Sequence, residues 1–197
     1  MDGDPLKVHS MNGAKIPLSC LAVSGSLRKE SSNTSLLEAA AAFAPGGMNI
    51  TVYRSLGELP YFNPDLDPAQ FQIVSTWISV VRDAHGVIVS TPEYAHGVPG
   101  VLKNGLDWLV GSDAFVNKPF MLLNASSRST YARESLVEIL STMSGVHVKA
   151  ATTTIPVLGK NPREISALVQ QNYAGQLRAS LEVFARTIRS EQRGVDN

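Results

Sequence analysis

Short apolar runs alternate with helix-periodic segments along most of the chain. Five strands are predicted, at residues 17–24, 48–53, 86–90, 119–124 and 147–155. The second of them is read from Ile50 and Val52, which fall on one face. Apolar residues at three- and four-residue spacing predict helices over 33–43, 68–84 and from 99 onward, then around 136–143 and 177–188. Strands that alternate with helices are typical of parallel sheets with right-handed crossovers. The pattern therefore predicts an α/β fold, with a doubly wound five-stranded parallel sheet in a three-layer sandwich.

The length of 197 residues and the absence of a low-complexity linker indicate one domain. We expect a flexible tail over residues 1–15, a single domain over 16–190 and a polar end over 191–197. The first residues lack an apolar signal core, and no apolar stretch approaches the roughly 18 residues of a membrane span. The expectation is a cytoplasmic protein without a membrane partner.

Charge is balanced, with 17 Lys and Arg against 17 Asp and Glu, which argues against a nucleic-acid partner. The single cysteine, Cys20, lies within an apolar run, so we interpret it as a buried small hydrophobe rather than a reactive thiol. The four histidines show no metal-ligand spacing, so no metal site is predicted.

The first strand ends in a loop rich in hydroxyl groups, Ser24-Gly-Ser-Leu-Arg-Lys-Glu-Ser-Ser-Asn-Thr34. It leads into a helix N-terminus, where free N–H groups favour an anion. Gly25 permits a tight turn, and Arg28 offers a planar charged fork suited to phosphate. The residues alone leave two interpretations open. The loop is either a phosphate site, with hydroxyl donors from Ser24, Ser26, Ser31 and Thr34, or a simple helix cap. The cap residue would be Ser31, Ser32 or Asn33. Dinucleotide and P-loop glycine motifs are absent.

The loop after the third strand reads Thr91-Pro-Glu-Tyr-Ala-His-Gly-Val-Pro-Gly100 and is stiffened by proline. Tyr94 and His96 offer flat faces, and the backbone amides of residues 93–97 suit the polar edge of a planar heterocycle. Glu93 is positioned to anchor the loop by accepting hydrogen bonds. An ordinary surface turn is the alternative. His96 has no visible carboxylate partner for a role as general base.

Three segments in order carry a resemblance: Gly25-Ser-Leu-Arg-x-x-Ser-x-Asn33, Thr91-Pro-Glu-Tyr94 and Pro99-Gly-Val-Leu-Lys-Asn-Gly-Leu-Asp-Trp108. They resemble the NAD(P)H-dependent FMN reductase family, which has a flavodoxin-like fold and includes quinone and chromate reductases. The resemblance extends over residues 16–184. It implies FMN as cofactor and NADPH or NADH as co-substrate.

The resemblance also implies where the cofactor binds. Phosphate-loop positions match Ser26, Arg28, Ser31 and Asn33, and ring- and ribityl-binding positions match Pro92, Glu93 and Tyr94. With their neighbours, the expected cofactor-binding residues are Ser24, Ser26, Arg28, Ser31, Asn33, Thr34, Pro92, Glu93, Tyr94, Ala95, His96, Ser126 and Arg128. The helix that follows is expected to supply scaffold and subunit-interface residues, Lys103, Asn104, Asp107 and Trp108.

Two departures from the family pattern bear on substrate choice. Ala95 stands where the family usually has Asn, and the loop at residues 126–132 is bulkier than the family's glycine-rich one. Arg128 in that loop has two further readings, a contact with a phosphate of the pyridine nucleotide or a subunit contact.

The resemblance implies an oxidoreductase that passes hydride from NAD(P)H through FMN to a small acceptor: a quinone, free flavin, azo dye or metal oxyanion. No catalytic side chain is expected, because the cofactor carries the chemistry. A homodimer or homotetramer is expected. The alternatives are a flavodoxin-type electron carrier, which balanced charge and Arg28 disfavour, and a flavin-free binding or regulatory module.

Overall fold

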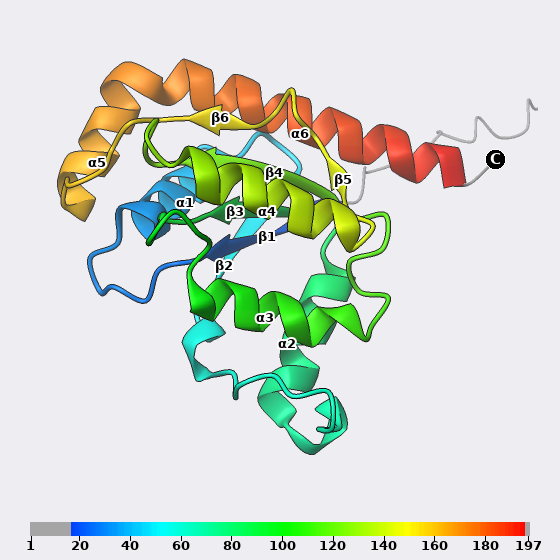
Figure 1. Ribbon diagram of the computed structural model, residues 1–197. Helices are drawn as coiled ribbons and strands as arrows, with labels where there is room; N and C mark the ends of the chain where they lie inside the picture. The colour runs from blue at the N-terminus through cyan, green and yellow to red at the C-terminus, as the bar shows by residue number, and fades with distance from the viewer. Residues whose placement is uncertain (1–16, 196–197) are drawn as a thin grey trace, which may run out of the picture.

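The computed structural model describes residues 17–195, so the expected tail at 1–15 lies outside the described residues. The sheet runs in the order β2-β1-β3-β4-β5, and all of its pairings are parallel (Figure 1). Four strands have bounds close to those predicted: β1 Leu18–Ser24, β2 Met48–Tyr53, β3 Gly86–Ser90 and β4 Pro119–Asn124. Continuous apolar runs set the limits of β1, β3 and β4, whereas β2 has Ile50 and Val52 on one face and polar residues between.

Helices cover both faces of the sheet, so the predicted three layers are present (Figure 1). They are α1 Ser32–Ala42, α2 Gln72–Asp83, α3 Gly100–Val110, α4 Thr130–Thr142, α5 Pro162–Leu168 and α6 Ala174–Val195. One face packs against α1, α5 and α6, and the other against α2, α3 and α4. The last helix runs to Val195, past residue 190, where we had placed the end of the domain.

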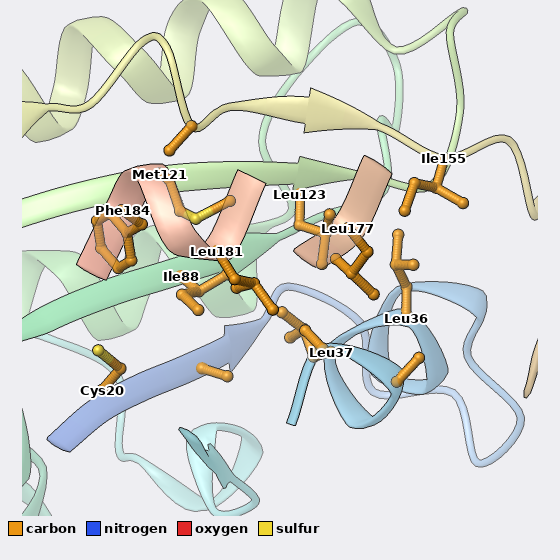
Figure 2. Close-up of a cluster of buried hydrophobic side chains, with 14 of the residues drawn as sticks. Cys20, Leu36, Leu37, Ile88, Met121, Leu123, Ile155, Leu177, Leu181 and Phe184 are labelled. Atoms are coloured by element: carbon orange, nitrogen blue, oxygen red, sulfur yellow. The ribbon is translucent and has the colours of Figure 1, made fainter. Parts of the chain in front are cut away.

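Alternate residues of β1 belong to two different cores. Cys20 and Ala22 face α1 and α6, as part of the cluster drawn in Figure 2, whereas Leu21 and Val23 face the α2–α3 side. A strand buried on both faces reads as a continuous apolar run. Cys20 is buried, which confirms the interpretation of this residue as a buried hydrophobe, and burial raises the pKa of its thiol to about 12.

The fifth strand, predicted over 147–155, is wrong as a single element. Two short segments share that position: β5 Val146–His147 pairs with the start of β4, and β6 Thr153–Thr154 pairs with its end. Between these two segments the chain leaves the edge of the sheet in a turn. The Thr152 hydroxyl there accepts a hydrogen bond from the Leu122 N–H at 3.1 Å. A side chain thus takes the place of a strand carbonyl, and the sheet edge continues across the interruption.

The helix predicted over 68–84 begins later than expected. A short 3-10 turn, Pro68–Gln70, comes first, with the Asp67 carboxylate accepting from the Ala69 N–H at 2.9 Å. Phe71 then has extended backbone, and α2 starts at Gln72. Two other short turns are the 3-10 turn Leu56–Glu58 and the π-helical turn Val169–Tyr173, which leads from α5 into α6.

The strand order places β1 between β2 and β3, so the winding of the sheet reverses there. In doubly wound sheets ligands bind beyond the carboxyl ends of the strands at this point. The loops that leave β1 and β3 therefore meet where a site is expected. Within residues 17–195, no helix has both the length and the apolar character that crossing a membrane requires.

Candidate functional site

A hollow of about 150 Å³ lies beyond the carboxyl ends of β1, β3 and β4. Loops from all three strands contribute to it, as the strand order predicts. Eight of the predicted residues line it: Ser26, Arg28, Ser31, Asn33, Pro92, Glu93, Tyr94 and Ser126. Five other residues complete the lining and were not predicted: Ser32, Thr91, Ala125, Ser129 and Leu158.

The β1–α1 loop packs tightly against the β3–α3 loop. The Gly25 N–H donates to the Ser90 carbonyl at 2.9 Å, and a Cβ on Gly25 would lie 2.2 Å from the Thr91 Oγ1. Only glycine fits such an approach. The exposed Leu27 side chain packs over Gly57, which fixes the outer part of the same loop.

Hydrogen bonds among hydroxyl groups and the backbone hold the β1–α1 loop in shape. Thr34 Oγ1 donates to Ser24 Oγ at 2.8 Å, and Ser24 Oγ also accepts from the Ser26 N–H at 3.3 Å. Ser31 is the N-cap of α1, because its Oγ accepts from the Thr34 N–H. Ser24 and Thr34 thus support the loop rather than line the hollow. Of the three predicted candidates for the cap, Ser31, Ser32 and Asn33, Ser31 is the cap.

Asn33 is a buried polar side chain with unused donors. It is 4% exposed, and its Oδ1 accepts from Ser90 Oγ at 3.0 Å. Within the described part of the chain, its Nδ2 donates to no protein acceptor. Nδ2 is not an enclosed atom, so its N–H groups are open to the hollow and are available to donate to a ligand. The Arg28 guanidinium at the same hollow forms no ion pair with any described carboxylate.

The β3–α3 loop makes a tight turn at Tyr94–Gly97. Tyr94 and Gly97 exchange backbone hydrogen bonds of 3.1 and 2.9 Å, so two of the amides that we expected to face a ligand bond within the turn. Ala95 and His96 both have positive φ, at 49° and 57°. Left-handed backbone costs a residue other than glycine about 1–2 kcal/mol, and Asn tolerates it better than Ala.

Two contacts tie this turn to the start of α4. Glu93 Oε2 accepts from the Ala132 N–H at 2.9 Å, so Glu93 anchors its loop as the sequence suggested. The rings of His96 and Tyr131 stack with centroids 4.3 Å apart. A carboxylate at a helix N-terminus is favoured by both the free N–H group and the helix dipole.

The β4–α4 loop presents hydroxyl groups rather than its arginine. Ser126 and Ser129 line the hollow, and Ser126 Oγ also accepts from the Arg128 N–H at 3.1 Å. Arg128 is exposed and does not line the hollow, and neither do Ala95 and His96.

Comparison with known proteins identifies the family. The model of the family described as "NADPH-dependent FMN reductase" matches residues 18–157. The chain belongs to the NADPH-dependent FMN reductase family. The family and the flavodoxin-like fold that the sequence predicted are thereby confirmed. FMN and NAD(P)H are the cofactors of this family.

Several curated relatives of this chain are themselves reductases. A 2-hydroxy-1,4-benzoquinone reductase from a Burkholderia species is 35% identical over 107 residues, which cover 53% of this chain and 58% of the relative. A quinone reductase from Escherichia coli is 32% identical over 106 residues, covering 52% and 56%. The chain thus spans a little over half the length of these relatives.

A solved structure matches more of the fold. The flavoenzyme NAD(P)H:(acceptor) oxidoreductase FerB from Paracoccus denitrificans aligns with a TM-score of 0.70. The alignment covers 86% of this chain and 98% of that one, with 22% sequence identity. At this level of identity, the likeness establishes the fold alone.

Proposed function

We propose that this FMN reductase family member is an FMN-dependent NAD(P)H oxidoreductase that reduces small acceptors, with quinones as the first class to test. One observation carries the proposal: the hollow at the carboxyl end of β1 holds the unused N–H groups of the buried Asn33. A phosphate group needs such donors, and charge-assisted hydrogen bonds to it are strong. The Arg28 guanidinium at the same hollow supplies the charge.

The phosphate of FMN would lie over the β1–α1 loop. Asn33 and Arg28 would donate to its oxygens, as would the hydroxyl groups of Ser26 and Ser31. Ser24 and Thr34 would keep the loop in shape through their mutual hydrogen bond. The N-terminus of α1 adds a favourable dipole for the negative charge.

The flavin ring would lie toward the β3–α3 and β4–α4 loops. Pro92, Tyr94 and Ser126 line that part of the hollow, and Glu93 holds the two loops together through Ala132. The N–H groups of Ala95 and His96 form no backbone hydrogen bond within the turn, so they would be free for the polar edge of the ring. Arg128, exposed beside Ser126, would attract anionic groups of the co-substrate.

When bound, FMN takes a hydride from the nicotinamide and delivers two electrons to the acceptor. The chain's own part is to bind and orient the reactants. Donors near the polar edge of the ring would also stabilise negative charge there. Relatives named as quinone reductases support a quinone as acceptor. Free flavins, azo dyes and metal oxyanions remain further classes to test.

The decisive experiment uses the purified full chain. We expect FMN to bind with quenching of its fluorescence, and NADPH added without oxygen to bleach the visible flavin band. Failure of FMN to bind would favour the flavin-free module. Binding without bleaching by NADPH or NADH would favour the electron carrier. Because NAD(P)H is supplied inside the cell, we place the activity in the cytoplasm, which cell fractionation tests.

We further propose a homodimer or homotetramer in which the loop over α3 contacts another subunit. Tyr61 is 90% exposed at its tip, although the loop itself is firmly held. Trp108 Nε1 and Asn104 Nδ2 both donate to the Pro60 carbonyl, and Phe62 packs edge-on against Trp108. Tyrosine is enriched at subunit interfaces, and a rigid loop can present its ring without a loss of loop entropy. Light scattering should give a multiple of the monomer mass, reduced in Tyr61→Ser.

A further inference from the structure

Ser90, the last residue of β3, places a hydroxyl group in an otherwise apolar strand. The whole of β3 is buried, and Ser90 itself is 1% exposed. Burying a hydroxyl group is unfavourable unless the group forms a hydrogen bond. Within the described residues, the one hydrogen bond of this hydroxyl is to Asn33 Oδ1, at 3.0 Å. Ser90 does not line the hollow, so any role it has in binding is exerted through Asn33 or the backbone.

Ser90 holds the β1–α1 loop at two points. Its carbonyl accepts from the Gly25 N–H at 2.9 Å, and its hydroxyl donates to Asn33. Gly25 directly follows β1, and Asn33 lies in the first turn of α1. Both ends of the loop that would hold a phosphate are therefore fixed to a single buried residue of the neighbouring strand.

The hydrogen bond from Ser90 sets the direction of the Asn33 amide. A serine hydroxyl has one proton to donate, and Ser90 gives it to the amide oxygen. The Asn33 oxygen is thereby engaged, and the N–H groups of Nδ2 are left open to the hollow. The reverse orientation would present a carbonyl oxygen, which repels an anion. With the amide held in this way, Asn33 offers the hollow only donors, which an ionised phosphate accepts at every oxygen.

We propose that Ser90 is a positioning residue for phosphate recognition: its hydroxyl orients the Asn33 amide so that the hollow selects a terminal phosphate over an uncharged hydroxyl group. This inference rests on the proposed function, because FMN carries that phosphate. Riboflavin has the same ring and ribityl chain but ends in a hydroxyl group. The ratio of FMN affinity to riboflavin affinity therefore measures what Ser90 contributes, separately from contacts with the ring.

The test compares Ser90→Ala with Ser90→Thr in the full chain, by fluorescence titration with FMN and with riboflavin. Without the hydroxyl the amide is free to turn, so the affinity ratio should fall about two- to tenfold, as for the loss of one hydrogen bond. Threonine keeps the hydroxyl and should keep the ratio near the wild-type value. Ser180→Ala is the matched control, because it removes a buried hydroxyl that donates to the Ala151 carbonyl. An unchanged ratio in Ser90→Ala, or an equal fall in Ser180→Ala, would overturn the proposal.

A double-mutant cycle shows whether Ser90 acts through Asn33. Asn33→Ala should itself lower the ratio of FMN to riboflavin affinity. Ser90→Ala added to Asn33→Ala should lower the ratio no further, because the amide that Ser90 orients is gone. Additive losses would mean that Ser90 acts by another route and would contradict the proposal, whatever the threonine variant does.

Calorimetry with inorganic phosphate separates this inference from the proposed function. The wild type should bind phosphate, and Ser90→Ala should bind it about two- to tenfold more weakly. If that result is obtained but the wild type binds no FMN, the proposed function fails and the inference stands. If FMN binds and neither FMN nor phosphate affinity depends on Ser90, the inference alone fails. If the wild type binds neither FMN nor phosphate, both fail.

Discussion

The polar groups at the two ends of the central sheet differ in their hydrogen bonding. At the amino end, Lys118 Nζ donates to the carbonyl groups of Arg82 and Ala84, and His85 Nδ1 accepts from the Ser19 N–H at 2.9 Å. At the carboxyl end, Asn33 keeps unused donors. The larger hollow, about 390 Å³, lies at the amino end and is lined in part by these bonded residues, Lys118 and His85. A buried amide whose donors face the hollow, rather than the volume of the hollow, therefore marks the candidate binding end.

Backbone strain separates the two ends less cleanly. Ala95 and His96 have positive φ at the carboxyl end, but Asn117 and Ser144 also have it near the amino end. There the Asn117 N–H donates to the Ser144 carbonyl at 2.9 Å, so the two strained residues support each other. At the carboxyl end, the strained turn presents exposed side chains to a hollow. The comparison predicts that changes at the carboxyl end affect binding, and changes at the amino end affect stability.

The largest expected effect is at the carboxyl end. Arg28→Ala should weaken FMN binding about 10- to 100-fold, because it removes a charged donor worth about 1.5–3 kcal/mol. Arg28 is exposed and forms no ion pair with a described residue, so the melting temperature without FMN should hardly change. Fluorescence titration with FMN measures the affinity. Lys29→Ala, at the neighbouring exposed position, is the control. Equal losses of FMN affinity in both variants would mean that Arg28 contributes only its positive charge and no specific contact.

The amino end should respond in the opposite way. Lys118→Met removes the donor that two helix-end carbonyl groups share, so the free energy of unfolding should fall by about 1–3 kcal/mol. Lys118 is half-buried, and this burial lowers its pKa. FMN affinity should stay at the wild-type value. Urea unfolding and FMN titration on one preparation test both statements, and weakened FMN binding would break the contrast between the ends.

The sequence predicted the parts of this architecture that rest on local signals. Buried apolar runs defined β1, β3 and β4, and alternation defined β2. The Ser-rich turn after Val23 marked the loop that forms the hollow. The sequence did not predict the break in the fifth strand, because the Thr152 hydroxyl takes the place of a backbone carbonyl of the sheet only in the folded chain. Threonine has high β-propensity, so the run from 147 to 155 read as one strand.

Long-range contacts were the other gap. Leu158 reaches the hollow from the segment after β6, which carries no motif of its own. The stacking of Tyr131 was not predicted because its partner is His96, a residue in a different loop. The strand order brings these loops together, and no local pattern encodes that proximity. The bulky loop at 126–132, noted as a departure from the family, was the one available signal for Tyr131.

The next largest effect is expected at Glu93, which anchors the β3–α3 loop to the start of α4. Glu93→Ala should cost about 0.5–2 kcal/mol of stability, the range for loss of a cap at a helix N-terminus, and FMN should bind several-fold more weakly. Glu93→Gln keeps an oxygen that accepts from the Ala132 N–H, so it should recover most of both losses. Hydrogen exchange at the Ala132 amide should quicken in the alanine variant only. Glu138→Ala, exposed on α4, is the control. A glutamine variant as damaged as alanine would contradict the anchor.

A smaller gain is expected from relieving the strained turn. Ala95→Asn should raise the free energy of unfolding by about 0.5–1 kcal/mol, because asparagine adopts positive φ more readily than alanine does. Thermal unfolding measures the gain. Ala150→Asn, an exposed change in a turn without positive φ, should give no such gain. Equal responses at the two positions would mean that the strain at Ala95 is already relieved.

The smallest effect concerns His147, next to the interruption in the sheet edge. Its ring stacks on Phe120 and its Nε2 lies 2.9 Å from Thr152 Oγ1. Burial, and to a lesser extent the charge of Lys149, lowers the pKa of His147 below its ordinary 6.5. The unfolded chain therefore binds the proton more readily, so stability should fall as pH drops from about 6.5 through the folded-state pKa.

His147→Gln should remove that part of the pH dependence, as urea unfolding at pH 8 and pH 5 would show. Lys149→Gln should reduce it less, because burial is the larger cause. FMN binding should not change in either variant, since His147 does not line the hollow. If Lys149→Gln flattened the profile as much as His147→Gln, charge rather than burial would control this histidine.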